Sequence, residues 1–227
     1  MTIEQRLPEP WRRRLYLPAY STSTAARYAG APVGTVTYWH YSSSSLDPAL
    51  PGKERRVPLS YLQLIEVAFV ATFRNLGFSL QKIRRTREYA AQVLEAEFPF
   101  AQLKWWTEGH NLLLQLKDVE PKTHLDGLII TNTAGQVAWS PLVDARFIEF
   151  EYQDGLAIQW HVGGKESPVL IDPRVSYGAP MVKGVPTWAL KGRSLAGEPV
   201  SEIAQDFGIS EPDVKAALTF EGVQPAA

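Results

Sequence analysis

A short segment of small, hydrogen-bonding side chains flanked by arginines suggests contact with nucleic acid. The segment 33–41 is predicted to be a helix whose side chains can reach base edges: Thr35, Thr37, Tyr38 and His40. The cations around it suit contacts with phosphates: Arg12, Arg13, Arg14, Arg27, Lys53, Arg55 and Arg56. Phosphate contacts supply most of the affinity of a DNA-binding protein, whereas base contacts select the sequence. We therefore predict a DNA-binding site made of these residues, with the helix 33–41 lying in the major groove.

A group of carboxylates near the C-terminus forms a second candidate site. Its members are Glu198, Glu202, Asp206, Glu211 and Asp213, and residues 197–221 hold six acids against one base. Two of them begin the helix predicted over 211–220, where they would repel phosphates but suit the positive end of their own helix dipole. We therefore predict that this acidic surface binds a protein, and that a basic partner would match it best.

Both sites fall on the same spacing of small and apolar residues, which is typical of a helix-turn-helix. In the first copy the positions are Ala25, Ala26, Ala29, Gly30, Ala31, Val36 and Trp39. In the second copy, 178 residues later, they are Ile203, Ala204, Phe207, Gly208, Ile209, Val214 and Ala217. A small residue before the turn lets two helices pack closely, and the glycine provides the left-handed backbone that joins them. Charge separates the two copies, since the first has basic flanks and the second is acidic.

The elements that position these residues are predicted from hydrophobic periodicity and from helix caps. Helices are predicted over 22–29, with Ser21 or Ser23 as the N-cap, and over 33–41, 59–76, 80–97, 187–195, 199–207 and 211–220. Strands are predicted over 111–116, 128–131, 136–139, 146–152 and 156–161, with hairpin turns at 134–135 and 153–155. Serines and prolines over 42–51 predict a loop or wing. The fold class is therefore α+β: a helical domain over 1–100, a small antiparallel β module over 101–167 and a tri-helical domain over 168–227.

The composition is that of an ordinary globular protein, but the charge is unevenly distributed. Of the 227 residues, 45% are hydrophobic and 21% are charged. Residues 1–100 hold 13 Lys/Arg against 8 Asp/Glu, a net charge of +5, whereas residues 101–227 hold 10 against 16, a net charge of −6. This asymmetry favours a protein in which only the N-terminal part meets a polyanion. There is no cysteine, no stretch like a signal peptide over 1–14 and no apolar run long enough to span a bilayer, so we expect a soluble cytoplasmic protein without membrane contact.

The sequence contains no recognisable catalytic or cofactor-binding pattern. Its histidines, His40, His110, His124 and His161, lack the spacing of metal ligands, and no nucleophile elbow, phosphate loop or dinucleotide fingerprint occurs. Glu149 and Glu151 alternate with aromatics on a predicted strand, which is typical of a solvated face rather than an acid–base pair. The tryptophans are assigned to hydrophobic cores, with a ligand-stacking or partner-binding surface as the alternative: Trp105, Trp106, Trp139, Trp160 and Trp188. We therefore expect no enzymatic activity, no metal and no cofactor.

Three segments of the N-terminal part follow the pattern of a known family. They are 20–27 (YSTSTAAR), 35–39 (TVTYW) and 77–83 (GFSLQKI), separated by a serine-rich wing and a long helix. Over residues 17–95 this succession resembles the DNA-binding domain of MerR-type regulators, which implies a winged helix-turn-helix. The chain departs from that family because no coiled-coil dimerisation helix follows and no cysteine is present to sense a metal.

The C-terminal part contains a second recognisable succession. Its segments are 171–174 (IDPR), 178–184 (GAPMVKG), 197–207 (GEPVSEIAQDF) and 214–220 (VKAALTF). Over residues 168–221 they resemble the family called domain of unknown function 433, a small tri-helical fold that occurs in VapB-type antitoxins. Many members have Gly-Thr-Arg where this chain has Gly184-Val185-Pro186.

Together the two resemblances imply the antitoxin of a type II toxin–antitoxin pair. Such a protein would neutralise a PIN-like ribonuclease toxin and repress its own operon by binding operator DNA through residues 21–56. Helix-turn-helix proteins usually bind repeated half-sites as dimers, so we expect a homodimer. The alternative is a DNA-binding transcription regulator without a toxin, whose β module senses a small molecule. A purely structural interaction protein is the third possibility.

Overall fold

The chain folds into two compact units that contain both helices and sheets, which confirms the predicted α+β class. The computed structural model describes residues 10–41, 49–54, 56–102, 129–131, 137–139 and 145–224. The first unit comprises Met1–Ile148 and Tyr152–Ala157, and the second comprises Glu149–Glu151 and Ile158–Ala227. No helix in the described ranges is long and apolar enough to cross a membrane.

Short helices with well-defined ends build the first unit. They are the 3₁₀ helix Pro10–Leu15 and the α-helices α1 (Thr22–Ala29), α2 (Val33–His40), α3 (Tyr61–Asn75) and α4 (Leu80–Leu94). Ser21 caps α1 and Ser79 caps α4, each by accepting a hydrogen bond from a backbone N–H of the first turn. Helix α3 begins at Tyr61, two residues later than predicted, because Ser60 is its N-cap and forms a capping box with Gln63.

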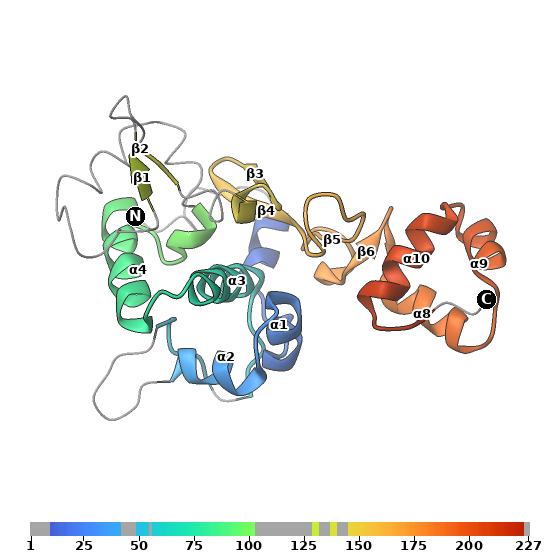
Figure 1. The fold of residues 1–227 in the computed structure, drawn as a ribbon, viewed down its shortest axis with the longest axis horizontal. Coiled ribbons are helices and arrows are strands. Elements are labelled where there is room, and N and C mark those ends of the chain that lie inside the picture. The colour runs from blue at the N-terminus through green and yellow to red at the C-terminus, as the bar shows by residue number, and fades with distance from the viewer. Residues whose placement is uncertain are drawn as a thin grey trace. The chain divides into compact units, whose positions relative to one another are not determined.

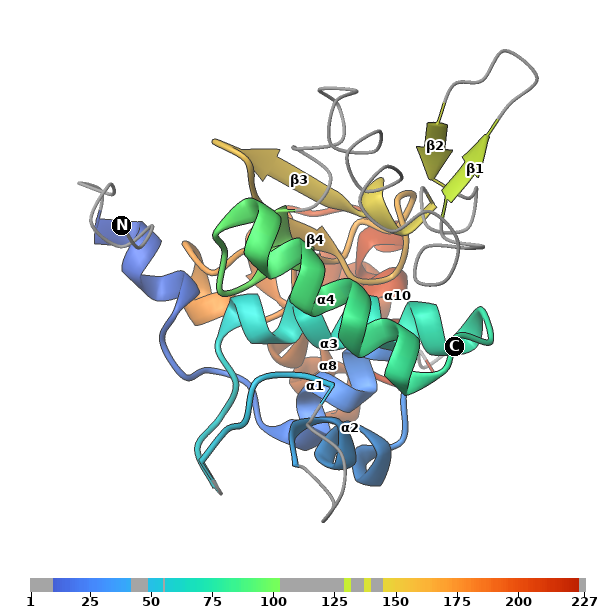
Figure 2. The same ribbon diagram turned by 90° about the vertical axis from the view of Figure 1, so that its left-hand side faces the viewer.

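Helix α3 is the centre of the first unit, with α1, α2 and α4 arranged around it (Figures 1 and 2). Its residues from Tyr61 to Phe73 are buried on every side except at Gln63. A helix that is apolar all round belongs in a core rather than at a surface. The bridge between Tyr20 and Leu59 fixes the strand-like segments that lead into α1 and α3.

The strand predicted over residues 146–152 is only partly present, because its first residues belong to the aromatic core beside α3. Residues 146–152 were expected to form one strand because Phe and Tyr alternate with other residues, but residues 145–147 form a helical turn and strand β3 begins only at Phe150. Phe147 is buried against Phe69, with ring centroids 5.2 Å apart. Phe150 instead stacks on Trp160, at 5.5 Å. The alternating pattern therefore placed Phe147 and Phe150 on one predicted strand, although the two side chains pack in different aromatic clusters.

The strands lie in two sheets. Strands β1 (Ile129–Thr131) and β2 (Val137–Trp139) form an antiparallel pair whose backbone register places Ile129 opposite Trp139. The second sheet has the order β3-β4-β5-β6-β7, with β3 at Phe150–Gln153, β4 at Leu156–His161, β5 at Leu170–Ile171, β6 at Met181–Val182 and β7 at Val185–Pro186. Asp154 and Gly155 both have positive φ, 50° and 80°, so the predicted hairpin turn between β3 and β4 is confirmed.

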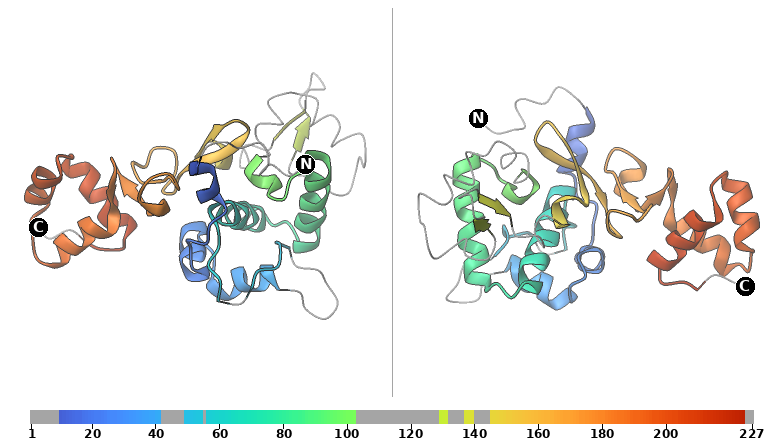
Figure 3. Two further views of the ribbon diagram at one scale, coloured as in Figure 1. Left: turned by 180° about the vertical axis from the view of Figure 1, so that it is seen from behind. Right: turned by 45° about the horizontal axis from the view of Figure 1, so that its top comes forward.

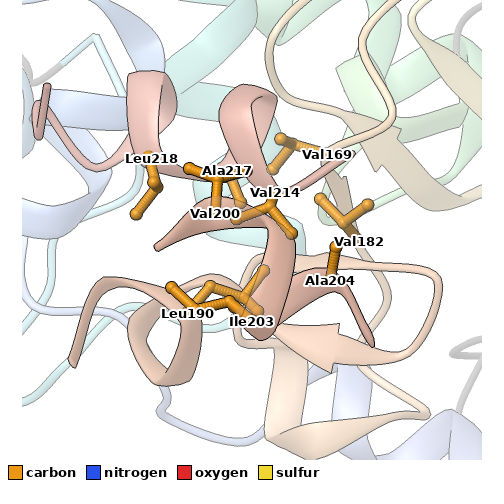
Figure 4. Packing of buried hydrophobic residues seen from close by; sticks show 9 residues of the cluster. All are labelled: Val169, Val182, Leu190, Val200, Ile203, Ala204, Val214, Ala217 and Leu218. Carbon is orange, nitrogen blue, oxygen red and sulfur yellow. The ribbon is translucent and has the colours of Figure 1, made fainter. Parts of the chain in front are cut away.

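Three helices complete the second unit, and their bounds agree closely with the prediction. They are α8 (Thr187–Leu195), α9 (Val200–Phe207) and α10 (Glu211–Phe220), which pack on one another beside β6 (Figure 3). Figure 4 shows the buried aliphatic side chains that they share with the strands: Val169, Val182, Leu190, Val200, Ile203, Ala204, Val214, Ala217 and Leu218. This cluster is the core of the tri-helical part.

The two predicted helix-turn-helix copies have the same turn. Gly30 and Gly208 both adopt the left-handed conformation, with φ of 66° and 65°. After each glycine the next residue donates a backbone hydrogen bond to the alanine five residues earlier, from Ala31 to Ala26 and from Ile209 to Ala204. This pattern closes both helices with a Schellman turn. The repeated spacing therefore encodes a repeated backbone geometry.

Candidate functional site

Helix α2 has an apolar face toward the core and a polar face that is open to solvent. Val36 and Trp39 are buried as predicted, at 0% and 2% exposed. Gly34 and Thr37 are exposed and Tyr38 is 47% exposed, and these three residues form what we call the recognition face. Thr35 is half-buried beside this face. The Thr37 hydroxyl donates to the carbonyl oxygen of Val33 at 2.9 Å, which fixes its orientation.

The expectation that His40 reads bases is wrong. His40 is only 2% exposed, and its Nδ1 donates to the carbonyl oxygen of Pro51 at 2.9 Å. Burial lowers its pKa from the ordinary value of 6.5, so the ring is neutral at pH 7. His40 follows Val36 by four residues and therefore shares its inward face, a periodicity that the sequence already contained.

A cavity opens beside the recognition face. It has a volume of about 420 Å³ and is lined by Ser21, Thr22, Thr37, Tyr41, Lys53, Arg56, Val57 and Pro58. Ser21 and Thr22 place the N-terminus of α1 at this cavity, and the first N–H groups of a helix favour an anion. Lys53 and Arg56 add positive charge, although Lys53 Nζ also donates to the carbonyl oxygen of Val57 at 2.6 Å. The arrangement suits a phosphate group.

Tyr41 is a residue of this cavity that the sequence prediction missed. It lies at the C-terminal cap of α2, one turn after Thr37. Its spacing of four residues from Thr37 was the available signal, because residues four apart share one helix face. The cavity thus combines hydroxyl groups from α2 with the start of α1.

The other predicted phosphate contacts differ in their surroundings. Arg12 forms an ion pair with Asp154 and its side chain is only 13% exposed, so it links parts of the first unit instead of extending into solvent. Arg13 and Arg14 are exposed on the 3₁₀ helix, and the exposed Arg27 lies over the ring of Tyr28 at 5.0 Å. Arg55 lies outside the described residues.

The acidic surface of the second unit is partly engaged in ion pairs. Arg193 binds Glu198 and Asp206 together, with a distance of 2.6 Å to Asp206. Lys215 pairs with Glu211 at 3.2 Å, whereas Glu202 is exposed on α9. A carboxylate surface is therefore present over α9, beginning just before it at Glu198.

Asp213 does not belong to that surface, which corrects its assignment as a protein contact. It is 8% exposed, caps α10 in a capping box with Ser210 and lies 2.8 Å from Lys183. Hydrogen bonds from Lys183 and Ser210 lower its pKa. Asp213 therefore lies at the positive end of its own helix dipole, as the sequence predicted, and the structure adds its part in the capping box.

Asp172 is a second buried carboxylate with a structural role. It accepts hydrogen bonds from Arg174 Nη2 at 2.7 Å and from Gln159 Nε2 at 2.6 Å. Burial acts to raise its pKa, but the hydrogen bonds outweigh burial and the pKa is lowered. This network holds the segment between β5 and β6 in place.

Several predicted site residues fall outside the described ranges. The β module expected to sense a ligand lies mostly in 103–128, 132–136 and 140–144, together with His110, His124, Trp105 and Trp106. Of the tryptophans that can be placed, Trp160 is fully buried, as predicted, but Trp188 is 64% exposed and does not fill a core. In the described part of the chain, no group of three or more His, Cys, Asp or Glu residues is arranged to hold a metal ion.

The fold is shared with a protein of known structure. The chain is similar to the crystal structure of Rv2018 from Mycobacterium tuberculosis, with a TM-score of 0.75, 22% sequence identity, and coverage of 90% of this chain and 99% of that one. At this identity the similarity shows the fold alone. No protein-family model matches the chain, and no curated protein sequence matches it.

Proposed function

We propose that this chain is the antitoxin of a type II toxin–antitoxin pair that binds operator DNA as an autorepressor. In this proposal the first unit reads DNA through a MerR-like winged helix-turn-helix, and the second unit holds a PIN-like ribonuclease toxin. The protein acts by binding and not by catalysis, as a homodimer in the cytoplasm, where both partners occur.

The observation that carries the proposal is that the recognition face lies beside the cavity lined by Lys53 and Arg56. Gly34, Thr37 and Tyr38 are exposed on α2, where small and hydrogen-bonding groups suit base edges. The cavity beside them joins the start of α1 to two cations, as a phosphate contact requires. A phosphate held there would fix the register of α2 in the major groove.

The contrast between the two helix-turn-helix copies supports separate partners. Helix α10 begins with Glu211 and carries the buried cap Asp213, so its N-terminus is not a phosphate site. The acidic residues Glu198, Glu202 and Asp206 suit a basic protein such as a nuclease. The second copy of the turn therefore serves helix packing and protein binding.

A salt titration of DNA binding tests the first part of the proposal. The probe is a labelled duplex from upstream of the reading frame, bound to the full chain between 50 and 200 mM salt. Arg56→Ala and Lys53→Ala are each expected to weaken binding and to reduce the slope of log K against log salt by about 1. Lys165→Ala removes an exposed cation of the second unit and serves as the matched control, with affinity and slope unchanged.

Two results would contradict the DNA assignment. The first is a wild-type chain that retains no duplex even at 50 mM salt, since nonspecific phosphate binding is strongest there. The second is an equal loss for Arg56→Ala and Lys165→Ala, because net charge alone would then explain the binding.

A further inference from the structure

The two cations of the cavity beside α2 lie on a stretch of chain that forms no helix or strand. It comprises the described residues 49–54 and 56–59, which we call the cation segment, and it carries Lys53 and Arg56. Both ends of this segment are buried, whereas most of the residues between them are exposed. The place of the two cations therefore depends on how the ends of the segment are attached.

The last residue of the cation segment is attached to the chain that leads into α1. The backbone N–H of Leu59 donates to the carbonyl oxygen of Tyr20 at 2.7 Å. The carbonyl oxygen of Leu59 accepts from the N–H groups of Ala19 and Tyr20, both at 2.9 Å. Ser21, the N-cap of α1, follows directly. These bonds fix this end of the segment relative to the start of α1, which also lines the cavity.

The first residues of the cation segment are attached to the end of α2 by two hydrogen bonds. The backbone N–H of Leu50 donates to the carbonyl oxygen of Trp39 at 3.0 Å, which serves one of the free carbonyls of the last helical turn. The side chain of His40 makes the other bond, from Nδ1 to the carbonyl oxygen of Pro51 at 2.9 Å. Pro51 precedes Lys53 by two residues, so His40 connects α2 to the cations at close range.

Inside the segment, short-range bonds join the two cations into one turn. Lys53 Nζ donates to the carbonyl oxygen of Val57 at 2.6 Å, and the N–H of Val57 donates to the carbonyl oxygen of Glu54 at 3.3 Å. Arg56 lies in this turn with a φ of 71°, a conformation that a residue other than glycine keeps only where its surroundings hold it. A displacement at Pro51 would therefore move both cations together.

We infer that His40 is a positioning residue for the phosphate contact: through its hydrogen bond to Pro51 it holds the cation segment in register with the recognition face of α2. His40 is only 2% exposed, so it does not itself touch DNA. Burial lowers its pKa, so the ring is neutral at pH 7 and adds no charge to the cavity. Its effect on binding therefore acts through Lys53 and Arg56. The inference rests on the proposed DNA binding and adds the residue that aligns its two parts.

The test compares two substitutions of His40 that differ in the hydrogen bond. His40→Leu fills the space with an apolar side chain that has no donor, whereas His40→Asn keeps an N–H group that can donate toward Pro51. In the salt titration of duplex binding, His40→Leu is expected to reduce the slope of log K against log salt by about 1 to 2, as the loss of both cations would. His40→Asn is expected to keep a slope nearer to that of the wild type. Should His40→Leu not fold, His40→Phe replaces it, since phenylalanine keeps a planar ring and lacks a donor.

A double-mutant cycle separates positioning from a general loss of stability. Arg56→Ala is expected to reduce the affinity by a smaller factor in the His40→Leu background than in the wild type, because Arg56 has already lost its place there. Phe147→Leu is the matched control, since Phe147 packs against Phe69 in the core of the same unit. It is expected to lower the thermal stability but to leave the salt slope and the cost of Arg56→Ala unchanged.

Each contrary outcome has a distinct meaning. If the wild type binds the duplex and Arg56→Ala costs the same factor with and without His40, DNA binding stands but the positioning role is wrong. If His40→Asn loses as much of the salt slope as His40→Leu, the hydrogen bond to Pro51 does not hold the segment and the inference is overturned. If the wild type retains no duplex at 50 mM salt, the proposed DNA binding and this inference both fail.

Discussion

Arg87 holds Glu66 as a buried ion pair in the middle of the first unit. Arg87 Nε donates to Glu66 Oε2 at 2.6 Å, and the backbone N–H of Phe100 donates to Oε1 at 2.8 Å. Glu66 is 0% exposed, and burial raises its pKa despite the opposing effect of the guanidinium. Arg87 also donates to the carbonyl oxygen of Glu97 at 2.6 Å. These hydrogen bonds connect α3 to α4 and to the segment after α4, in the same unit as the helices proposed to bind DNA.

Removal of Arg87 is expected to destabilise the first unit strongly. Arg87→Ala leaves the carboxylate of Glu66 buried without its counter-charge, which costs about 3–5 kcal/mol in comparable cases. The free energy of unfolding in urea measures the loss. Arg85→Ala, two residues away on the exposed side of α4, is the control and should change stability by less than about 0.5 kcal/mol. Equal effects of the two variants would mean that the pair is not a structural anchor.

The stability of the first unit is expected to fall as the pH drops below 6.5. Burial lowers the pKa of His40 in the folded state from the ordinary value of 6.5. Well above 6.5 His40 is neutral in both states and contributes no pH dependence. Below 6.5 the unfolded chain binds the proton first, so stability declines until the pH reaches the lower folded pKa. Urea midpoints at pH 7.5 and 5.5 measure this decline.

The variant His40→Asn separates His40 from the carboxylates that also titrate in acid. Its side-chain amide can still donate toward Pro51 but does not bind a proton in this range. We expect a lower stability at pH 7.5 and a smaller decline toward pH 5.5 than in the wild type. A decline as large as that of the wild type would assign the effect to other groups.

Two glycines of the second unit are expected to respond to alanine in opposite ways. Gly208 has φ of 65°, so Gly208→Ala is expected to lower the free energy of unfolding by about 1–2 kcal/mol. Gly192 is helical and has open space at its Cβ, so Gly192→Ala is expected to raise it by about 0.5–1 kcal/mol. Thermal unfolding of both variants measures the signs. A loss of stability for Gly192→Ala would show that α8 needs the glycine for its own fold.

Tyr38 is expected to affect sequence preference more than salt dependence. It is 47% exposed on α2 and contributes no charge. Tyr38→Ala should therefore reduce discrimination between the operator and a scrambled duplex by about 1 kcal/mol or more, with the salt slope unchanged. Anisotropy titrations with both duplexes measure the difference. A parallel loss on both duplexes would place Tyr38 among the backbone contacts instead.

Helix ends were predictable wherever short-range chemistry determines them. Helix α1 runs over the predicted residues because Ser21 caps its start and Gly30 closes its end. Helix α10 does so because Ser210 and Asp213 form a capping box. These signals act over three or four residues and depend little on the rest of the chain. The inward position of Val36 follows from periodicity in the same way.

The errors arose where long-range packing or a second role decided the outcome. Phe147 and Phe150 looked like one strand face, but each packs on an aromatic residue that is distant in sequence, Phe69 or Trp160. Asp213 is one acid in an acidic region, and its ion pair is with Lys183, which lies 30 residues earlier in the chain. The cavity beside α2 joins the start of α1 with Lys53 and residues 56–58, a proximity that only the folded chain reveals.

The division of the chain into units has a consequence for gene truncations. The polypeptide leaves the first unit after Ile148, returns to it for Tyr152–Ala157 and leaves it again at Ile158. A stop codon after Ile148 would therefore remove the buried residues Leu156 and Ala157 from the first unit. A start at Ile158 would in turn deprive the second unit of Phe150, the residue that stacks on Trp160. A single cut therefore does not leave both units intact, so the two proposed contacts, with DNA and with a protein, are best separated by point substitutions in the uncut chain.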